Sequence, residues 1–278
     1  MRRMNRKSSL RRIRIGCVLL AIIIAAIVGA PLITNISPTA AHSASRLSSF
    51  SAEHPFGTDR YGRDLLSRTL YGGRVTLVMT LTALSMALVM GTLIGIATGL
   101  NKDSVFDVVV MRVIDVLMAF PFMVLALVVT ALFGASLCNL LLVVISVWWV
   151  PFARMARSIV LQVKDDESVL AAKVLGASQP HIVFREVLPK VTGPIFTLAT
   201  FELGTLILSI SALSFLGMGA QPPSPEWGSM LSDARAHFFQ SPYLIVGPSL
   251  FIILTVFSLN LIGEGMRDLL DPYESVEL

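Results

Sequence analysis

Six apolar runs dominate the pattern of hydrophobic and polar positions along the chain. They cover residues 16–33, 74–100, 120–133, 140–152, 194–216 and 243–262. Because a transmembrane helix needs about 20 mostly apolar residues, the third and fourth runs require flanking turns to complete a span. The pattern predicts an all-α polytopic membrane protein with six transmembrane helices.

Polar segments between the runs divide the predicted protein into parts. We expect a basic cytoplasmic N-terminus at 1–15 and a first transmembrane helix with an extracytoplasmic loop at 16–73. A core with five transmembrane helices follows at 74–265, and a cytoplasmic tail ends the chain at 266–278. The core includes a long polar loop at 158–193, which is also predicted to be cytoplasmic.

The orientation follows from the basic residues at the start of the chain, which are Arg2, Arg3, Arg6, Lys7, Arg11, Arg12 and Arg14. Such a cluster directly before an apolar run marks the cytoplasmic end of a span. This position favours membrane lipid over nucleic acid as its partner. An even number of spans then places both termini in the cytoplasm, although arginines in the first extracytoplasmic loop oppose this orientation.

A basic start followed by an apolar run is also typical of a cleaved signal peptide, which would leave five spans. The length of the run favours a retained helix. The small-residue site at Thr39-Ala40-Ala41 also lies well beyond the end of the run.

Composition strengthens the membrane assignment and excludes several functions. Hydrophobic residues make up 54% of the chain and charged residues 14%, with a mean hydropathy of +0.76, whereas soluble domains are about a quarter charged. No Gly-x-x-x-x-Gly-Lys-Ser/Thr loop or nucleophile–base set occurs. We therefore predict neither an enzyme nor ATP binding by this chain. The four histidines are scattered without ligand spacing, so no metal site is predicted.

A stripe of small residues runs along the second span. Ala83, Ala87, Gly91, Gly95 and Gly99 recur every four residues. Small residues at this spacing let two helices approach closely in lipid. The stripe predicts a tight helix pair and no particular function.

The loop at 158–193 predicts two short helices joined at a glycine. Asp165 and Asp166 are suitable N-caps for the first helix, and Gly176 can adopt the left-handed conformation that ends it. Ser178 and Pro180 suit the start of the second helix, and Pro189 is expected to stop it.

Two further elements are expected outside the spans. Before the second span, an interfacial helix capped by Thr58 or Asp59 is predicted, with Leu65, Leu66 and Leu70 on its apolar side. Residues 101–119 are predicted to form a short connection with an amphipathic turn at the membrane interface.

Glu202 lies inside the fifth run, where an ionisable group is a functional candidate because its burial in lipid is expensive. Two interpretations stay open. Glu202 lines a translocation pathway, or it hydrogen-bonds a neighbouring helix or partner subunit.

The loop resembles the EAA loop of bacterial ABC importer permeases through Ala171-Ala172-x-x-x-Gly176 and the later Leu188-Pro189. Leu170 and Glu186 depart from that pattern. In the family this loop docks onto the ATP-hydrolysing subunit. The resemblance therefore implies an ATPase-coupling set of Leu170, Ala171, Ala172, Gly176, Glu186, Leu188 and Pro189.

A second resemblance is to the C-type subunit of the dipeptide, oligopeptide and nickel permeases. It rests on Phe56–Arg68, Ser214–Gly228, Asp233-Ala-Arg235 and residues 260–272. It implies a type I ABC importer permease in the bacterial inner membrane. The implied partners are a second homologous permease, two ATP-binding subunits that hold ATP and Mg²⁺, and an extracytoplasmic solute-binding protein. The implied cargo is a short peptide, or nickel or another metal chelate.

Two other classes of function remain as alternatives. A secondary transporter driven by an ion gradient would show repeated halves and several intramembrane acids. A membrane scaffold would not require a glycine-jointed pair of cytoplasmic helices.

Overall fold

The computed structural model describes residues 2–270, and the side chains within residues 7–269. The described chain forms helices and loops without a β-strand, which confirms the all-α prediction. The elements are α1 (Arg2–Val28), α2 (Ala30–Ile33), η1 (Ser43–Ser45), α3 (Leu65–Leu100), α4 (Val105–Ala119), α5 (Phe122–Phe133), α6 (Leu137–Val163), α7 (Glu167–Val174), α8 (Gln179–His181), the π-helix η2 (Ile182–Val187), α9 (Leu188–Phe215), α10 (Trp227–Arg235), η3 (Pro242–Ile245) and α11 (Val246–Leu270).

Four stretches of the described chain are long and apolar enough to cross a membrane. They are Leu65–Leu100, Leu137–Val163, Gln179–Phe215 and Pro242–Leu269, and α4 with α5 adds a fifth if the bent pair is one span. By length and composition, the described residues therefore provide four or five candidate spans and not the predicted six. The helix α1 is not among these stretches; its N-terminal half carries Arg11, Arg12 and Arg14, and Gly29 separates it from α2.

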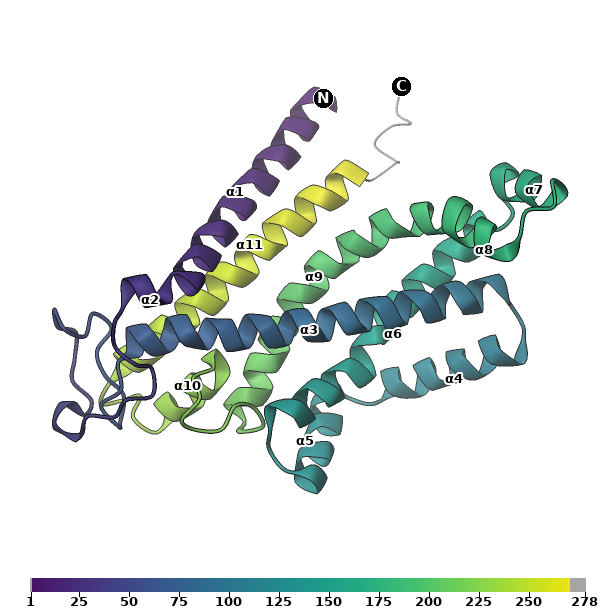
Figure 1. Cartoon of the computed structure of the whole chain (residues 1–278). Coiled ribbons are helices and arrows are strands. Elements are labelled where there is room, and N and C mark those ends of the chain that lie inside the picture. The colour runs from purple at the N-terminus through teal and green to yellow at the C-terminus, as the bar shows by residue number, and fades with distance from the viewer. Residues whose placement is uncertain (1, 271–278) are drawn as a thin grey trace.

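The long helices pack in pairs around α9. The helix α1 lies along α11, α3 lies along α6, and α9 contacts α3, α6 and α11 (Figure 1). The N-terminus, the end of α11 and α7 lie toward one side of the molecule, and residues 34–64 and α10 lie toward the other (Figure 1). We call these the α7 side and the α10 side.

The small-residue stripe of α3 forms the contact with α6, as predicted. All five of its residues are buried. A Cβ atom added at Gly91 would lie 2.3 Å from the carbonyl oxygen of Trp149, and one at Gly95 would lie 2.3 Å from that of Ala153. Backbone atoms of the two helices are therefore in direct contact, which dispersion forces favour in lipid.

The predicted connection at 101–119 was wrong in extent, because most of it is the helix α4. Ser104 caps this helix by accepting a hydrogen bond from the Asp107 N–H at 3.1 Å. The third span predicted at 120–133 corresponds to α5, which is bent by 89° from α4 around Pro121. The fourth run completes its span as expected by extending on both sides into α6, with Pro151 inside the helix.

The loop between the fourth and fifth spans is shorter than predicted. The helix α6 continues to Val163, and after the short helix α7 the continuous helical stretch that ends at Phe215 begins at Gln179. Pro189 does not stop a helix, which corrects the prediction. It lies in the first turn of α9, where a missing N–H is tolerated, and the π-helix η2 runs directly into it.

The segment before α3 contains no separate interfacial helix, which is a second correction. Asp64 caps α3 by accepting a hydrogen bond from the Ser67 N–H at 2.7 Å, so Leu65 and Leu70 belong to the 36-residue helix α3 itself. The predicted tail at 266–278 begins as the last turn of α11, and its residues 271–278 lie outside the described part of the chain.

Candidate functional site

The helix α7 lies at the outer end of the molecule, beyond the end of α3 (Figure 1). Asp166 occupies its N-cap position and Glu167 its first turn, where an acidic side chain complements the helix dipole. Gly176 ends the segment with a φ of +77°, the left-handed conformation that the sequence predicted. No atom lies within 4 Å of a Cβ built at Gly176, so the glycine joint is open to its surroundings.

The outer surface of α7 is apolar and exposed. Val174 is 87% exposed, Leu175 86% and Leu170 45%. Val169 on the opposite face is fully buried, and Ala172 packs against the same core cluster. An apolar surface anchored in this way, on a segment outside the long spans, indicates a docking site for another protein.

The structure separates the predicted coupling residues into two groups. In the first group, Leu170 and Ala171 are exposed on α7, Ala172 is half-buried there, and Gly176 is exposed just after the helix. Glu186 is half-buried in η2, Leu188 packs against the core cluster, and Pro189 is exposed at the start of α9. Leu188 is therefore a packing residue and does not belong to the outer docking surface.

Lys190 ties α7 to α9, a contact that the sequence analysis missed. Its Nζ atom lies 2.7 Å from a carboxylate oxygen of Asp166 and 3.1 Å from the hydroxyl of Ser168. An ion pair with both side chains this exposed contributes about 0–1 kcal/mol. The contact matters because it links the N-terminal end of α7 to the first turn of α9, a long apolar helix.

Glu202 of α9 borders a cavity of about 630 Å³ between α4, α5, α6 and α9. Apolar side chains such as Met118, Phe122 and Leu198 form most of its lining. Trp148 lines the same cavity as Glu202, and its buried indole N–H has no hydrogen-bond partner among the described residues.

Arg154 lines the same cavity and was not identified as a pathway candidate from the sequence. It is exposed and lies six residues after Trp148 on α6, which is a rise of about 9 Å. One carboxylate and one guanidinium thus face a mostly apolar cavity. This arrangement can accommodate a small molecule that carries both charges.

A bidentate ion pair holds α4 against α6 near this cavity. The Nε and Nη2 atoms of Arg157 donate to the two carboxylate oxygens of Asp107 at 2.7 and 2.8 Å. Asp107 is buried and also accepts from the Asp103 N–H at 3.1 Å. Bidentate pairing fixes geometry as well as providing energy, so the first turn of α4 is held in a defined position against α6.

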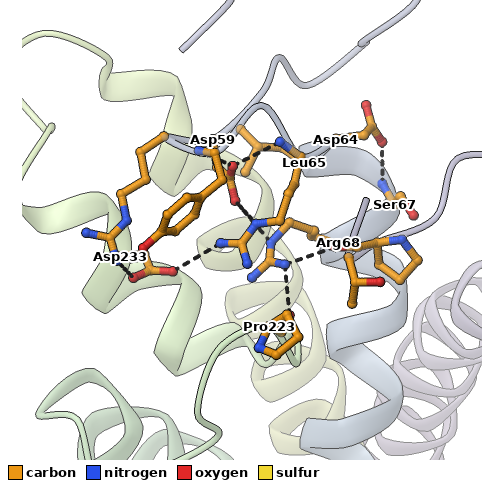
Figure 2. Close-up of polar contacts among 12 residues, drawn as sticks. Asp59, Asp64, Leu65, Ser67, Arg68, Pro223 and Asp233 are labelled. Atoms are coloured by element: carbon orange, nitrogen blue, oxygen red, sulfur yellow. Dashed lines mark hydrogen bonds and ion pairs between the residues drawn. The ribbon is translucent and has the colours of Figure 1, made fainter. Parts of the chain in front are cut away.

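On the α10 side, a buried cluster of charges joins the segment before α3 to α10 (Figure 2). Asp59 lies 2.6 Å from the Nε of Arg63 and 3.5 Å from that of Arg68. Asp233 of α10 pairs with Arg63 at 3.5 Å, and Arg68 donates to the Pro223 carbonyl at 3.2 Å. Because Arg63 and Arg68 are almost fully buried, this cluster holds the segment before α3 against α10 and exposes little surface to a substrate.

Glu226 connects the same region to the middle of α3. Its carboxylate accepts from the Gly228 and Ser229 N–H groups at 2.8 Å each and caps α10, and the Thr76 hydroxyl donates to it at 3.2 Å. Burial raises the pKa of Glu226, an effect that these hydrogen bonds oppose. The adjacent Trp227 is fully buried and donates to the Thr69 carbonyl at 2.8 Å.

These features define a class of protein: a helical membrane protein with a charged cavity among its spans and, outside them, a short helix with an exposed apolar surface. Residues 91–275 match the family described as binding-protein-dependent transport system inner membrane component. The chain belongs to this family.

Similar proteins agree with this assignment. The chain is 39% identical over 258 residues to the dipeptide transport system permease protein DppC of Alkalihalophilus pseudofirmus, covering 93% of this chain and 84% of that protein. It is 40% identical over 223 residues to the glutathione transport system permease protein GsiD of Escherichia coli O6:K15:H31, covering 80% and 73%. An inward-facing structure of the MetNI methionine ABC transporter matches with a TM-score of 0.55 and 17% identity, over 70% of this chain and 93% of that one, and so shares the fold.

The chain is accordingly a permease component of an ABC importer rather than an enzyme, and ATP hydrolysis takes place on separate subunits. The family implies a partner permease, ATPase subunits and a substrate-binding protein in general terms. It also implies an inner membrane protein with several spans.

Proposed function

We propose that this chain forms half of the translocation pathway of an ATP-driven importer of short peptides, with α7 as the helix that docks onto an ATPase. The observation that carries the proposal is the exposed apolar surface of Leu170, Val174 and Leu175 next to the open joint at Gly176. A monomer gains nothing from exposing such a surface, whereas a partner groove would bury it.

The proposed complex has one copy of this chain, a second homologous permease, two ATP-binding subunits and an extracytoplasmic solute-binding protein. ATP and Mg²⁺ would be held by the ATP-binding subunits. The α7 side, which carries both ends of the described chain, then faces the cytoplasm, and the α10 side faces the binding protein (Figure 1).

The connection from α7 to α9 supports a mechanism. Closure of the ATPases would move α7, and the Lys190–Asp166 contact together with buried Val169 would carry that motion into α9. Since Glu202 lies 14 residues after Leu188 on the same helix, about 21 Å along its axis, movement of α9 repositions one wall of the cavity.

A peptide cargo is supported by the cavity and by the names of the relatives. Glu202 can face an ammonium group and Arg154 a carboxylate, and a free peptide carries both. The two relatives described above are named for dipeptide and glutathione transport. Nickel or metal-chelate cargo stays a prediction, and no group of three or more possible metal-ligating side chains occurs among the described residues.

Reconstitution distinguishes this function from transport driven by an ion gradient. The intact complex in proteoliposomes, supplied with binding protein and a labelled dipeptide, should accumulate the peptide only when ATP reaches the ATPase subunits. Collapsing ion gradients with an ionophore should leave uptake unchanged, and a hydrolysis-deficient ATPase subunit serves as the control. Uptake without ATP that follows an imposed ion gradient would contradict the proposal.

A further inference from the structure

A second cavity of about 630 Å³ lies where three candidate spans end on the α7 side. Residues of the last two turns of α3, including Leu93, Ile96 and Leu100, form one wall, and Phe184 of η2 lies opposite. Lys164 at the end of α6 and Lys173 in the last turn of α7 also line it. None of the residues described above as functional candidates lines it.

The two lysines face this cavity without a compensating acid. No carboxylate is among the residues that line it, all of which the structure describes. The Lys173 ammonium group donates a hydrogen bond to the Lys164 carbonyl at 3.4 Å, which neutralises neither charge. Two cations beside one cavity repel each other, and an anion between them would relieve that repulsion.

The apolar wall shows which kind of anion fits. From Leu93 to Leu100 the wall extends about 10 Å into the candidate span of α3, and Leu93 is well exposed. A free phosphate would use the lysines but not this wall. A phospholipid would use both, because its headgroup lies at the ends of the spans and its acyl chains lie alongside them.

We propose that this cavity binds an anionic phospholipid of the cytoplasmic leaflet, with the headgroup between Lys164 and Lys173 and an acyl chain along Leu93 and Leu100. The assignment of the leaflet rests on the orientation proposed above. The lipid fills the space between α7 and the end of α3, and so contacts the docking helix on its membrane side.

Native mass spectrometry of the intact transporter tests this inference. The complex is purified from membranes that contain phosphatidylglycerol and zwitterionic phosphatidylethanolamine, without ATP or cargo. Wild type should retain phosphatidylglycerol preferentially. The K164Q/K173Q variant should bind it roughly thirty-fold more weakly, the effect expected of two lysines near an anionic headgroup. The charge-matched control R11Q/R14Q alters two exposed arginines of α1 that do not line the cavity, and it should retain the lipid.

Three results would overturn the proposal: equal retention by K164Q/K173Q and wild type, no preference of wild type for the anionic lipid, or displacement of the lipid by inorganic phosphate. If the lysines served only the helix ends, the double variant would lower the yield of complex in every lipid and leave retention unchanged. The single variant K173Q, expected to weaken binding about five-fold, keeps the test available if the double variant does not assemble. Since retention is measured without ATP or cargo, a failure of the proposed transport function cannot imitate any of these outcomes.

Discussion

At the scale of single residues, Glu202 borders a cavity that residues of α6 also line. This position fits both roles considered for it, lining a translocation pathway and contacting a neighbouring helix. The hydroxyls of Thr205 and Ser209 donate to carbonyls of their own helix at 3.2 and 2.9 Å, so they are not committed to the carboxylate. Glu202 borders the cavity together with Trp148, whose indole N–H has no hydrogen-bond partner among the described residues. A carboxylate at this depth is expensive unless it is paired, protonated or in contact with water.

The substitution Glu202→Gln separates a role in the pathway from a role in assembly. If Glu202 senses cargo, the variant should assemble with normal basal ATPase activity and take up less peptide, with a larger loss for cationic peptides. If it is an interhelical contact, the yield of intact complex should fall while uptake per complex is unchanged. Yield and uptake are measured in one preparation, and unchanged values for both would contradict both interpretations.

At the scale of helices, the predictions that succeeded relied on local rules. The spacing of small residues on α3 identified a packing face, and its partner proved to be α6. The need for a positive φ identified Gly176 as a helix end. Apolar runs located the long helices, because a bilayer and a protein core both select continuous apolar surface.

The predictions that failed depended on contacts between distant segments. Pro189 was expected to stop a helix, but the preceding π-helix delivers the chain directly into α9. The charge cluster around Asp59 and Arg68 joins residues about 170 positions apart, including Asp233, and no local pattern indicates such pairing. Arg154 directly follows the fourth apolar run, and the sequence does not show that its side chain shares a cavity with Glu202.

The substitution Gly95→Val tests the close contact between α3 and α6. Its Cβ would lie 2.3 Å from the Ala153 carbonyl oxygen, so the helices must separate, at a cost above the about 1–3 kcal/mol typical of overpacking. We expect a lower thermal midpoint and a lower yield of the purified complex. Ser85→Val, which also places valine on α3 but on its exposed face, should change neither. Equal behaviour of the two variants would show that the stripe does not hold the pair together.

At the scale of the whole molecule, one long helical stretch joins a tightly held region on the α10 side to an exposed helix on the α7 side. The buried charge cluster and the capped helix α10 make the α10 side rigid. The α7 side ends in a short exposed helix on an open glycine joint. The continuous stretch Gln179–Phe215 runs between them and carries Glu202 at the cavity wall. A permease that converts motion of a partner into opening of a pathway requires such a connection.

The central claim is that α7 couples this permease to ATP hydrolysis, and Gly176→Val tests it most directly. Valine resists the φ of +77° at this joint, with a cost of about 1–2 kcal/mol for a left-handed residue. Gly217 supplies the matched control, because it follows α9 with a φ of +91°, equally open surroundings and the same pattern of backbone hydrogen bonds as Gly176, but lies away from α7.

Peptide uptake per ATP hydrolysed should be measured in proteoliposomes that contain each variant in the intact complex. The account predicts that Gly176→Val inserts and assembles but loses most of its ATP-coupled uptake, while Gly217→Val transports at the wild-type ratio. Normal coupled uptake by Gly176→Val, or an equal loss in both variants, would contradict it.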